Sequence, residues 1–177
     1  MIRKLRMEDA PAMYEWMHDE SVVKNLQADF MSFGMEKVQS FIEENSEPDL
    51  SSTNVNYAIV DVDDNYVGTI SLKNIDHKNK NAEYAIVTSA KAHGKGYAKK
   101  ASMDILKVAF DDIGLERVYL YVSTENVAAN KFYQKMHFVE EGVFRKHLMI
   151  NGELRDIRWY SILKEDYIRM KDDNGYA

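Results

Sequence analysis

The spacing of apolar residues along the chain predicts which segments are strands and which are helices. Seven segments have the alternation or the short apolar run of a strand, namely MIRKL, NYAIVDV, YVGTISLKNI, AEYAIVTS, RVYLYVS, FVEEGVFRKHLMI and LRDIRWYSILK. Four segments have apolar residues three and four apart, as a helix does, namely MEDAPAMYEWMHD, GMEKVQSFIEEN, residues 97–113 and NVAANKFYQKM. The predicted order is β-α-α-β-β-β-α-β-α-β-β.

The connections between these segments predict a mixed α/β sheet. Short turns join the three strands before residue 97, so these strands should pair antiparallel. The helix over 97–113 must cross over between the strands on either side of it, so those two strands should run parallel. We therefore expect a central sheet of about seven strands flanked by about four helices. We expect one domain over residues 1–177, with 168–177 as a frayed tail.

Composition narrows the setting and excludes several kinds of site. The chain is 45% hydrophobic and has no cysteine, so it can build a core but has no disulfide or thiolate metal site. Its five histidines have no ligand spacing, and we expect no metal. No apolar run approaches the roughly 18 residues of a membrane span, and we expect no signal peptide because no apolar stretch follows the charges of the first residues. We expect a cytoplasmic protein with no membrane partner.

Charge is unevenly distributed along the chain. The formal net charge is -6, which argues against a nucleic-acid partner. Acidic residues crowd the first thirty positions, namely Glu8, Asp9, Glu15, Asp19, Glu20 and Asp29. Lysines surround a glycine-containing stretch, namely Lys91, Lys95, Lys99 and Lys100. A local basic patch at a glycine turn indicates a small anionic ligand there.

The stretch HGKGYA, residues 93–98, lies between a predicted strand and a predicted helix. A helix N-terminus leaves N–H groups without partners, and glycines let an anion approach them closely. The P-loop spacing is absent, and the dinucleotide pattern G-x-G-x-x-G is incomplete because Lys99 takes the third glycine's place. Taken alone, the stretch is more typical of an ordinary turn with solvated lysines, because short glycine patterns recur by chance.

Two motifs together indicate a family. HGKGYA resembles the signature Arg/Gln-x-x-Gly-x-Gly/Ala, with His93 in the first place, Gly96 in the middle and Ala98 last. NVAANKFYQKMHF resembles the signature Asn-x-x-Ala-x-x-x-Tyr-x-x-x-x-Phe, with Met136 and His137 where many members carry Leu-Gly or Met-Gly. Both signatures belong to the GNAT superfamily of N-acetyltransferases, which the chain resembles over nearly its whole length. The segment EEGVFRKHLMINGELRDIRWYSILKEDY resembles the branch of spermidine, ribosomal-protein and amino-sugar N-acetyltransferases.

The resemblance implies acetyl-CoA as co-substrate and a central pair of parallel strands that splay apart. Pantetheine would enter the gap and pair with the backbone of Ile86, Val87 and Thr88. N–H groups from Gly94 to Lys99 would hold the pyrophosphate. The other implied cofactor-binding residues are His93, Lys95, Gly96, Tyr97, Ala98, Asn126, Asn130 and Lys135. Asn126 alone would be interpreted as a helix cap, and the two lysines of the turn as a solvated face.

The resemblance also implies residue roles in catalysis. Tyr133 matches the family's general acid, although its helical spacing alone would fit a half-buried aromatic residue. Glu83 corresponds to an often acidic position and could take the proton of the amine, or could pair with lysines of the nearby turn. A backbone N–H near Val87 would bind the oxyanion of the transition state.

The acceptor is less well determined by the sequence. The N-terminal acids suit a cationic acceptor such as a polyamine or a similar small amine, although they also fit a solvated helix face. A second cluster could bind the phosphates of a nucleotide-linked amino sugar, namely Arg145, His147, Arg155 and Arg158. A protein N-terminus, an amine antibiotic and a non-catalytic CoA-binding module are further alternatives. Edge strands at the last hairpin favour a homo-oligomer.

Overall fold

The computed structural model describes residues 1–174. Seven strands form one sheet in the order β1-β2-β3-β4-β5-β7-β6. The strands are β1 (Ile2–Arg3), β2 (Val55–Val60), β3 (Tyr66–Asp76), β4 (Asn81–Thr88), β5 (Arg117–Ser123), β6 (Val139–Ile150) and β7 (Glu153–Leu163). The helices are α1 (Ala10–Met17), α2 (Glu20–Val23), α3 (Met35–Glu44), α4 (Tyr97–Lys107), α5 (Val127–Lys135) and α6 (Lys164–Asn174). The predicted mixed α/β sheet is confirmed.

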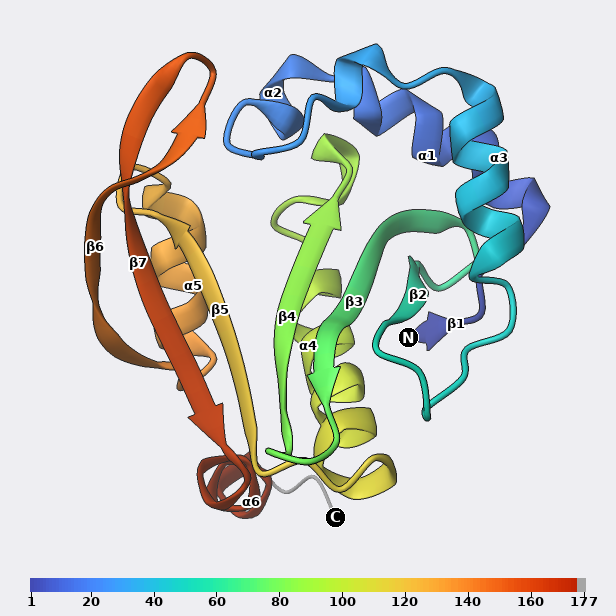
Figure 1. Cartoon of the computed structure of the whole chain (residues 1–177). Helices are drawn as coiled ribbons and strands as arrows, with labels where there is room; N and C mark the ends of the chain where they lie inside the picture. The colour runs from blue at the N-terminus through green and yellow to red at the C-terminus, as the bar shows by residue number, and fades with distance from the viewer. Residues whose placement is uncertain (175–177) are drawn as a thin grey trace.

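The two central strands run parallel and pair only at their first residues. β4 and β5 are in register from Asn81 opposite Arg117 to Glu83 opposite Tyr119. Both strands then continue, β4 as far as Thr88, without further pairing to each other. Figure 1 shows them diverging toward the end of the molecule at which α1 and α2 lie. The splay that the family resemblance implied is therefore confirmed, and all other neighbouring strands in the sheet are antiparallel.

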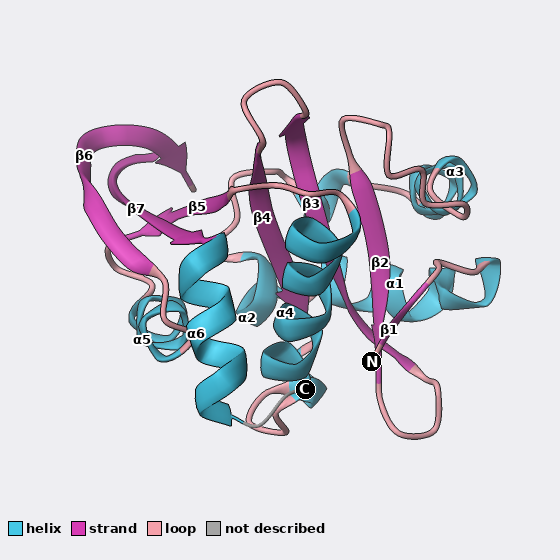
Figure 2. Cartoon of the chain, turned by 90° about the horizontal axis from the view of Figure 1, so that it is seen from below, coloured by secondary structure: helices cyan, strands magenta, loops and turns pink. Residues whose placement is uncertain are grey.

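Two apolar cores hold the helices against opposite faces of the sheet. The larger core joins β2 to β7 with α4, α5 and α6, which gather on one side of the strands in Figure 2. The smaller core packs α1 and α3 against the other face of β2 and β3. β2 serves both cores because its side chains alternate: Ile59 faces the larger core, while Ala58 and Val60 face the smaller one.

The structure has two helices beyond the four that the sequence predicts. One is the single turn α2, which follows Asp19 as its N-cap. The other is α6, which occupies most of the segment expected to be a frayed tail. That expectation is wrong as far as Asn174, because Tyr167 and Met170 are buried in the larger core and Tyr167 packs against Phe110. The tail residues 175–177 lie outside the described part of the chain.

Within residues 1–174, no helix has the length and apolar character needed to cross a membrane.

Candidate active site

A cavity of about 1070 Å³ opens where β4 and β5 separate. Residues from both faces of the sheet line it, so it passes between the two strands. We call its α4–α5 side the cofactor half, which includes His93, Gly94, Ala98, Ala129 and Tyr133. We call its α1–α3 side the acceptor half, which includes Lys24, Phe30, Phe33, Lys37 and Phe41.

The hydrogen-bond alternation of β4 decides which of its backbone groups face the gap. The Ser89 N–H donates to the Val67 carbonyl at 2.9 Å, and residues of an antiparallel pair bond in alternation. Val87, opposite Thr69, therefore bonds to β3. The position of its carbonyl agrees, because a Cβ added at Gly68 would lie 2.3 Å from the Val87 oxygen.

The same alternation directs the backbone groups of Ile86 and Thr88 toward the open side of β4, away from β3. These two residues can pair with an extended ligand, as predicted. The prediction for Val87 is corrected in one respect: the residue lines the cavity, but its N–H faces β3, so its backbone cannot pair with pantetheine as expected. An N–H of Ile86 or Thr88 is the available donor on this strand.

The glycine turn before α4 has the geometry of an anion cradle. Gly94 and Gly96 adopt φ values of 74° and 81°, which glycine reaches without strain. Within the described chain, the N–H groups of residues 94 and 96–99 have no main-chain acceptor. The Lys95 N–H is the exception, since it donates to the Ala92 carbonyl at 3.4 Å. Five N–H groups thus remain for a diphosphate.

The predicted residues of this turn take different places relative to the cavity. His93, Gly94 and Ala98 line it. Four other predicted residues belong to the same turn but do not line the cavity, namely Lys95, Gly96, Tyr97 and Lys99. A pyrophosphate bound here would therefore lie at the mouth of the cavity.

Asn126 caps α5 and also lines the cavity. Its Oδ1 accepts the Ala129 N–H at 3.2 Å, as a helix cap does. Lys135, at the other end of α5, is exposed and does not belong to the cavity wall formed by the described residues.

Asn130 is a structural residue rather than the predicted cofactor contact. Its amide donates to the carbonyls of Ser123 and Asn126 at 2.9 and 2.8 Å. Its Oδ1 accepts from the Arg158 guanidinium and the Tyr160 hydroxyl, both at 3.0 Å. Both amide hydrogens and both oxygen lone pairs are therefore used. The buried side chain ties α5 to β5 and β7 and does not line the cavity.

Tyr133 reaches the cofactor half from α5. Its side chain is 8% exposed and packs edge-on against Tyr84 and Phe138. Burial raises the pKa of its hydroxyl above the ordinary value, so the group stays protonated. Burial is the only cause of this shift, with no hydrogen bond contributing, and the residue lines the cavity, where its proton is available to a bound ligand.

Glu83 lies where the parallel pairing ends and lines the same cavity. The Asn74 amide donates to its Oε2 at 2.9 Å. Tyr121 of β5 is its neighbour across the gap, and burial together with the Glu83 carboxylate raises the pKa of Tyr121. A carboxylate held this way can accept a proton from an amine in the cavity.

The decisive comparison is with a family model. Residues 1–139 match the model described as "Acetyltransferase (GNAT) domain". The chain belongs to the GNAT acetyltransferase family. It is thus an acetyl-CoA-dependent N-acetyltransferase.

Named relatives agree with this membership. The acetyltransferase is 29% identical to spermidine N(1)-acetyltransferase of Vibrio cholerae over 116 residues, which are 66% of this chain and 67% of that protein. A structure of spermidine N-acetyltransferase from Vibrio cholerae in complex with CoA and spermine matches it with a TM-score of 0.84 at 22% identity, over 95% of this chain and 97% of that one. A GNAT-family acetyltransferase from Bacillus anthracis matches at 26% identity and a TM-score of 0.79, over 93% and 94% of the two chains.

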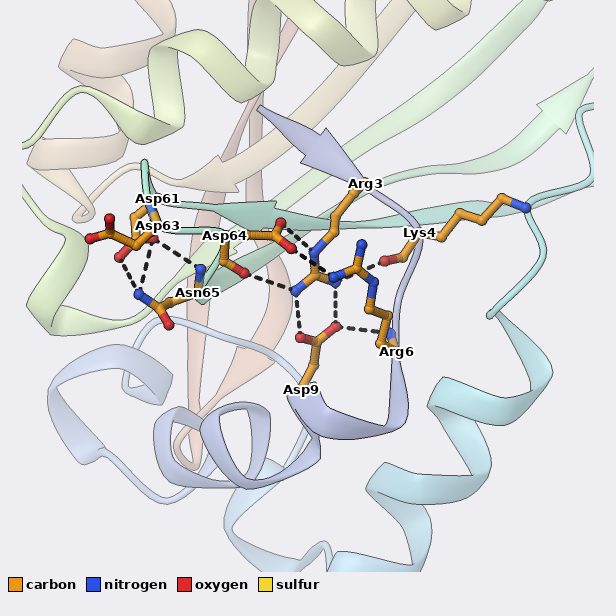
Figure 3. A network of polar contacts seen from close by, with 8 residues as sticks. All are labelled: Arg3, Lys4, Arg6, Asp9, Asp61, Asp63, Asp64 and Asn65. Carbon is orange, nitrogen blue, oxygen red and sulfur yellow. Dashed lines mark hydrogen bonds and ion pairs between the residues drawn. The ribbon is translucent and has the colours of Figure 1, made fainter.

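The acidic residues near the N-terminus do not face the acceptor. None of the six acids lies among the described residues that line the cavity. Asp9 accepts two hydrogen bonds from the Arg3 guanidinium, both at 2.8 Å, and Arg3 also binds Asp64 (Figure 3). Glu15 pairs with Lys91. Two of the six acids, Asp9 and Glu15, are therefore in ion pairs, and Asp19 caps α2.

Two of the three arginines of the last hairpin are also paired. Arg155 binds Glu125 and lies 2.7 Å from Glu153, and Arg158 lies 3.3 Å from Glu140. The charges of Arg155 and Arg158 are therefore offset locally, which weakens the support for a phosphate site at this hairpin.

Sequence reasoning did not find the neighbours of Glu83 or the lysines of the acceptor half. Tyr121 could have been found, since it alternates with Tyr119 on one face of β5. Asn74 has no sequence signal, because a register shift after Lys73 and a φ of 50° place it. No group of three or more potential metal ligands occurs among residues 1–174.

Proposed function

We propose that the acetyltransferase acts on a primary amine, which enters the acceptor half and reaches acetyl-CoA bound in the cofactor half. The observation that carries the proposal is that Glu83 and Tyr133, an acceptor and a donor of protons, line one cavity where β4 and β5 separate. In this arrangement, the amine would be deprotonated on one side of the thioester while the leaving thiolate is protonated on the other.

Glu83 has a defined role in this proposal. An amine with a pKa of about 10 is only about 0.1% neutral at pH 7, which costs about 4 kcal/mol if the enzyme does not help. The Glu83 carboxylate would accept the proton, directly or through a water molecule. The amine nitrogen then forms a bond to the acetyl carbon as the carbon–sulfur bond breaks.

Tyr133 would supply the proton for the sulfur. A thiolate whose conjugate acid has a pKa of about 8.5 can leave without an acid, but protonation prevents the reverse attack. The raised pKa of Tyr133 keeps its proton in place until that step. The N–H of Ile86 or Thr88 would stabilise the oxyanion.

A polyamine is the acceptor that the relatives favour. The Vibrio cholerae relative is named for spermidine. The acids that supported a polyamine from sequence are, however, absent from the described lining of the cavity. An amino-sugar nucleotide or a protein N-terminus is the alternative, and the lysines of the acceptor half favour it.

Release of free CoA thiol tests the proposal. The purified protein is mixed with acetyl-CoA and, in turn, with spermidine, an amino-sugar nucleotide and a peptide with a free N-terminus. Amine-dependent thiol release with an acetylated product is the expected result. Saturable CoA binding with no turnover of any amine would support a non-catalytic CoA-binding module instead.

Self-association is a separate proposal. β6 forms one edge of the sheet and exposes Val139, Val143 and Phe144. An exposed apolar edge can pair with a second copy. Light scattering would distinguish a homo-oligomer from a monomer, and a cytoplasmic location stays a prediction.

A further inference from the structure

The acceptor half has more positive than negative charge on its wall. Lys24, Lys37 and Lys73 line the cavity, and they come from the end of α2, from α3 and from β3. None of the three forms an ion pair with any residue in 1–174. This is unusual in a chain of net charge -6, and it is the opposite of what a polycationic acceptor requires.

Glu83 is the one carboxylate among the described residues that line the cavity. It already accepts the Asn74 amide, and it stands opposite Lys73 in the β3–β4 ladder. Directly opposite residues of a ladder share one face, so Glu83 offsets the charge of Lys73. Lys24 and Lys37 are left without a carboxylate in the cavity wall.

Aromatic side chains surround the two unmatched lysines. Phe30, Phe33 and Phe41 are only half-buried, although they contact the apolar core beneath α1 and α3. The Lys37 ammonium lies 3.4 Å from the centre of the Phe33 ring. Partly exposed rings in a cavity offer a surface for the flat or apolar part of a ligand.

The tip of the last hairpin closes over this region. The Asn151 amide of the β6–β7 turn donates to the Lys24 carbonyl at 2.8 Å. Figure 1 shows the hairpin reaching toward α2 at the same end of the molecule. Lys24 is thus fixed at the rim, where a ligand that fills the acceptor half passes it.

We propose that the acceptor is an amine that carries an anionic group and a ring or apolar body, with the anion held by Lys24 and Lys37 and the amine at Glu83. This inference rests on the proposed function and narrows its substrate class. A phosphate, as in an amino-sugar phosphate or nucleotide, and a carboxylate, as in an amino acid or peptide, share this chemistry.

Amines of similar size that differ in charge test whether an anionic group improves the acceptor. 6-Aminohexanoate, hexylamine and 1,6-diaminohexane have the same chain length and differ in their far end, while glucosamine and glucosamine 6-phosphate differ by one phosphate. We expect the anionic member of each set to have a kcat/KM at least tenfold above the others. A larger gain for the phosphate than for the carboxylate would indicate a phosphorylated acceptor. A kcat/KM for 1,6-diaminohexane equal to or above that of 6-aminohexanoate would overturn the inference.

Lysine variants assign the effect to the two residues. Lys37→Gln and Lys24→Gln should each reduce the preference for the anionic amine over hexylamine several-fold, and Lys37→Arg should restore it because it keeps the charge. Lys78→Gln, in an exposed turn outside the cavity, is the control and should leave the preference unchanged. An unchanged preference in both cavity variants would contradict the assignment.

The same experiment distinguishes a failure of the anionic-acceptor inference from a failure of the proposed acetyltransferase function. Wild-type enzyme that acetylates hexylamine or 1,6-diaminohexane but not the anionic amines supports the acetyltransferase function and refutes the anionic acceptor. Wild-type enzyme that binds CoA and acetylates no amine refutes the proposed function itself, and the acceptor inference with it.

Discussion

Glu83 of β4 and Tyr119 of β5 form the last pair in register between the two central parallel strands. Beyond this pair the strands expose backbone groups that no neighbouring strand uses, and the cavity opens there. The end of the pairing therefore places the carboxylate, the open edge of β4 and the glycine turn around one space. The predictions below follow from that arrangement.

Tyr133→Phe removes the proposed proton donor and keeps the buried ring. We expect kcat to fall roughly 100-fold while the affinity for CoA stays the same, since the ring still packs against Tyr84 and Phe138. Steady-state kinetics and calorimetry measure the two effects. Tyr57→Phe, a half-buried tyrosine away from the cavity, is the control. Unchanged turnover in Tyr133→Phe would remove this residue from the mechanism.

Glu83→Gln removes the proposed base and keeps a similar shape. We expect kcat/KM at pH 7 to fall roughly 100-fold. The difference in kcat/KM between wild type and variant should become smaller as pH rises, because the neutral fraction of the free amine increases about tenfold per pH unit below its pKa. A pH profile of both enzymes measures this change, with Glu43→Gln on the exposed side of α3 as the control. A constant ratio between wild type and variant at all pH values would contradict the role of base.

His137 occupies a backbone position that favours glycine. It follows α5 with a φ of 62°, and the two hydrogen bonds of a Schellman motif enclose it, from His137 N–H to Gln134 and from Phe138 N–H to Tyr133. His137→Gly should stabilise the protein by about 0.5–1 kcal/mol, which is a rise of roughly 2–4 °C in Tm at most. Thermal unfolding measures the shift.

His137→Ala is the matched variant for that experiment. Alanine at this position has the same left-handed backbone strain as histidine, so we expect no stabilisation from this variant. If both variants have the same Tm, the gain does not come from the backbone conformation.

Three buried tyrosines predict a loss of stability in alkali. Burial is the main cause that raises the pKa of Tyr66, Tyr84 and Tyr133 above the value of about 10 that they have in the unfolded chain. The folded state therefore binds more protons than the unfolded state above pH 10. Stability is fully present below that pH and should fall by about 1.4 kcal/mol per tyrosine for each further pH unit, until the folded groups titrate.

Urea unfolding between pH 8 and pH 11.5 measures this slope. Tyr66→Phe should reduce the slope of the free energy of unfolding against pH by the contribution of one tyrosine. A free energy of unfolding that stays constant through pH 11 would contradict the assignment.

The fold could be predicted because its signals are local. Alternation and turn residues mark the seven strands, and the helix over 97–113 requires the parallel pair. The tail was mistaken for frayed chain because polar residues dominate it. Only Tyr167 and Met170, three residues apart, indicate the buried face of α6.

The site could be predicted only in part because contacts in it are set by tertiary structure. The family resemblance pointed to Tyr133 through its motif and to Glu83 through its strand position, and both residues line the cavity. It could not show that the Asn130 amide is fully used, because two of its partners, Arg158 and Tyr160, lie on the distant strand β7. It also could not show that the Val87 N–H faces β3, because the pairing register of β3 and β4 decides this. Lys24 and Lys37 gave no sequence signal, since each is an ordinary exposed lysine until the helices fold over the cavity.

Titration of coenzyme A into the purified protein by calorimetry tests the central claim most directly. The account predicts saturable one-to-one binding that weakens at least tenfold when Gly96→Val places a side chain and backbone strain at the φ of 81° before α4. A folded protein that gives no binding heat at millimolar coenzyme A would contradict it.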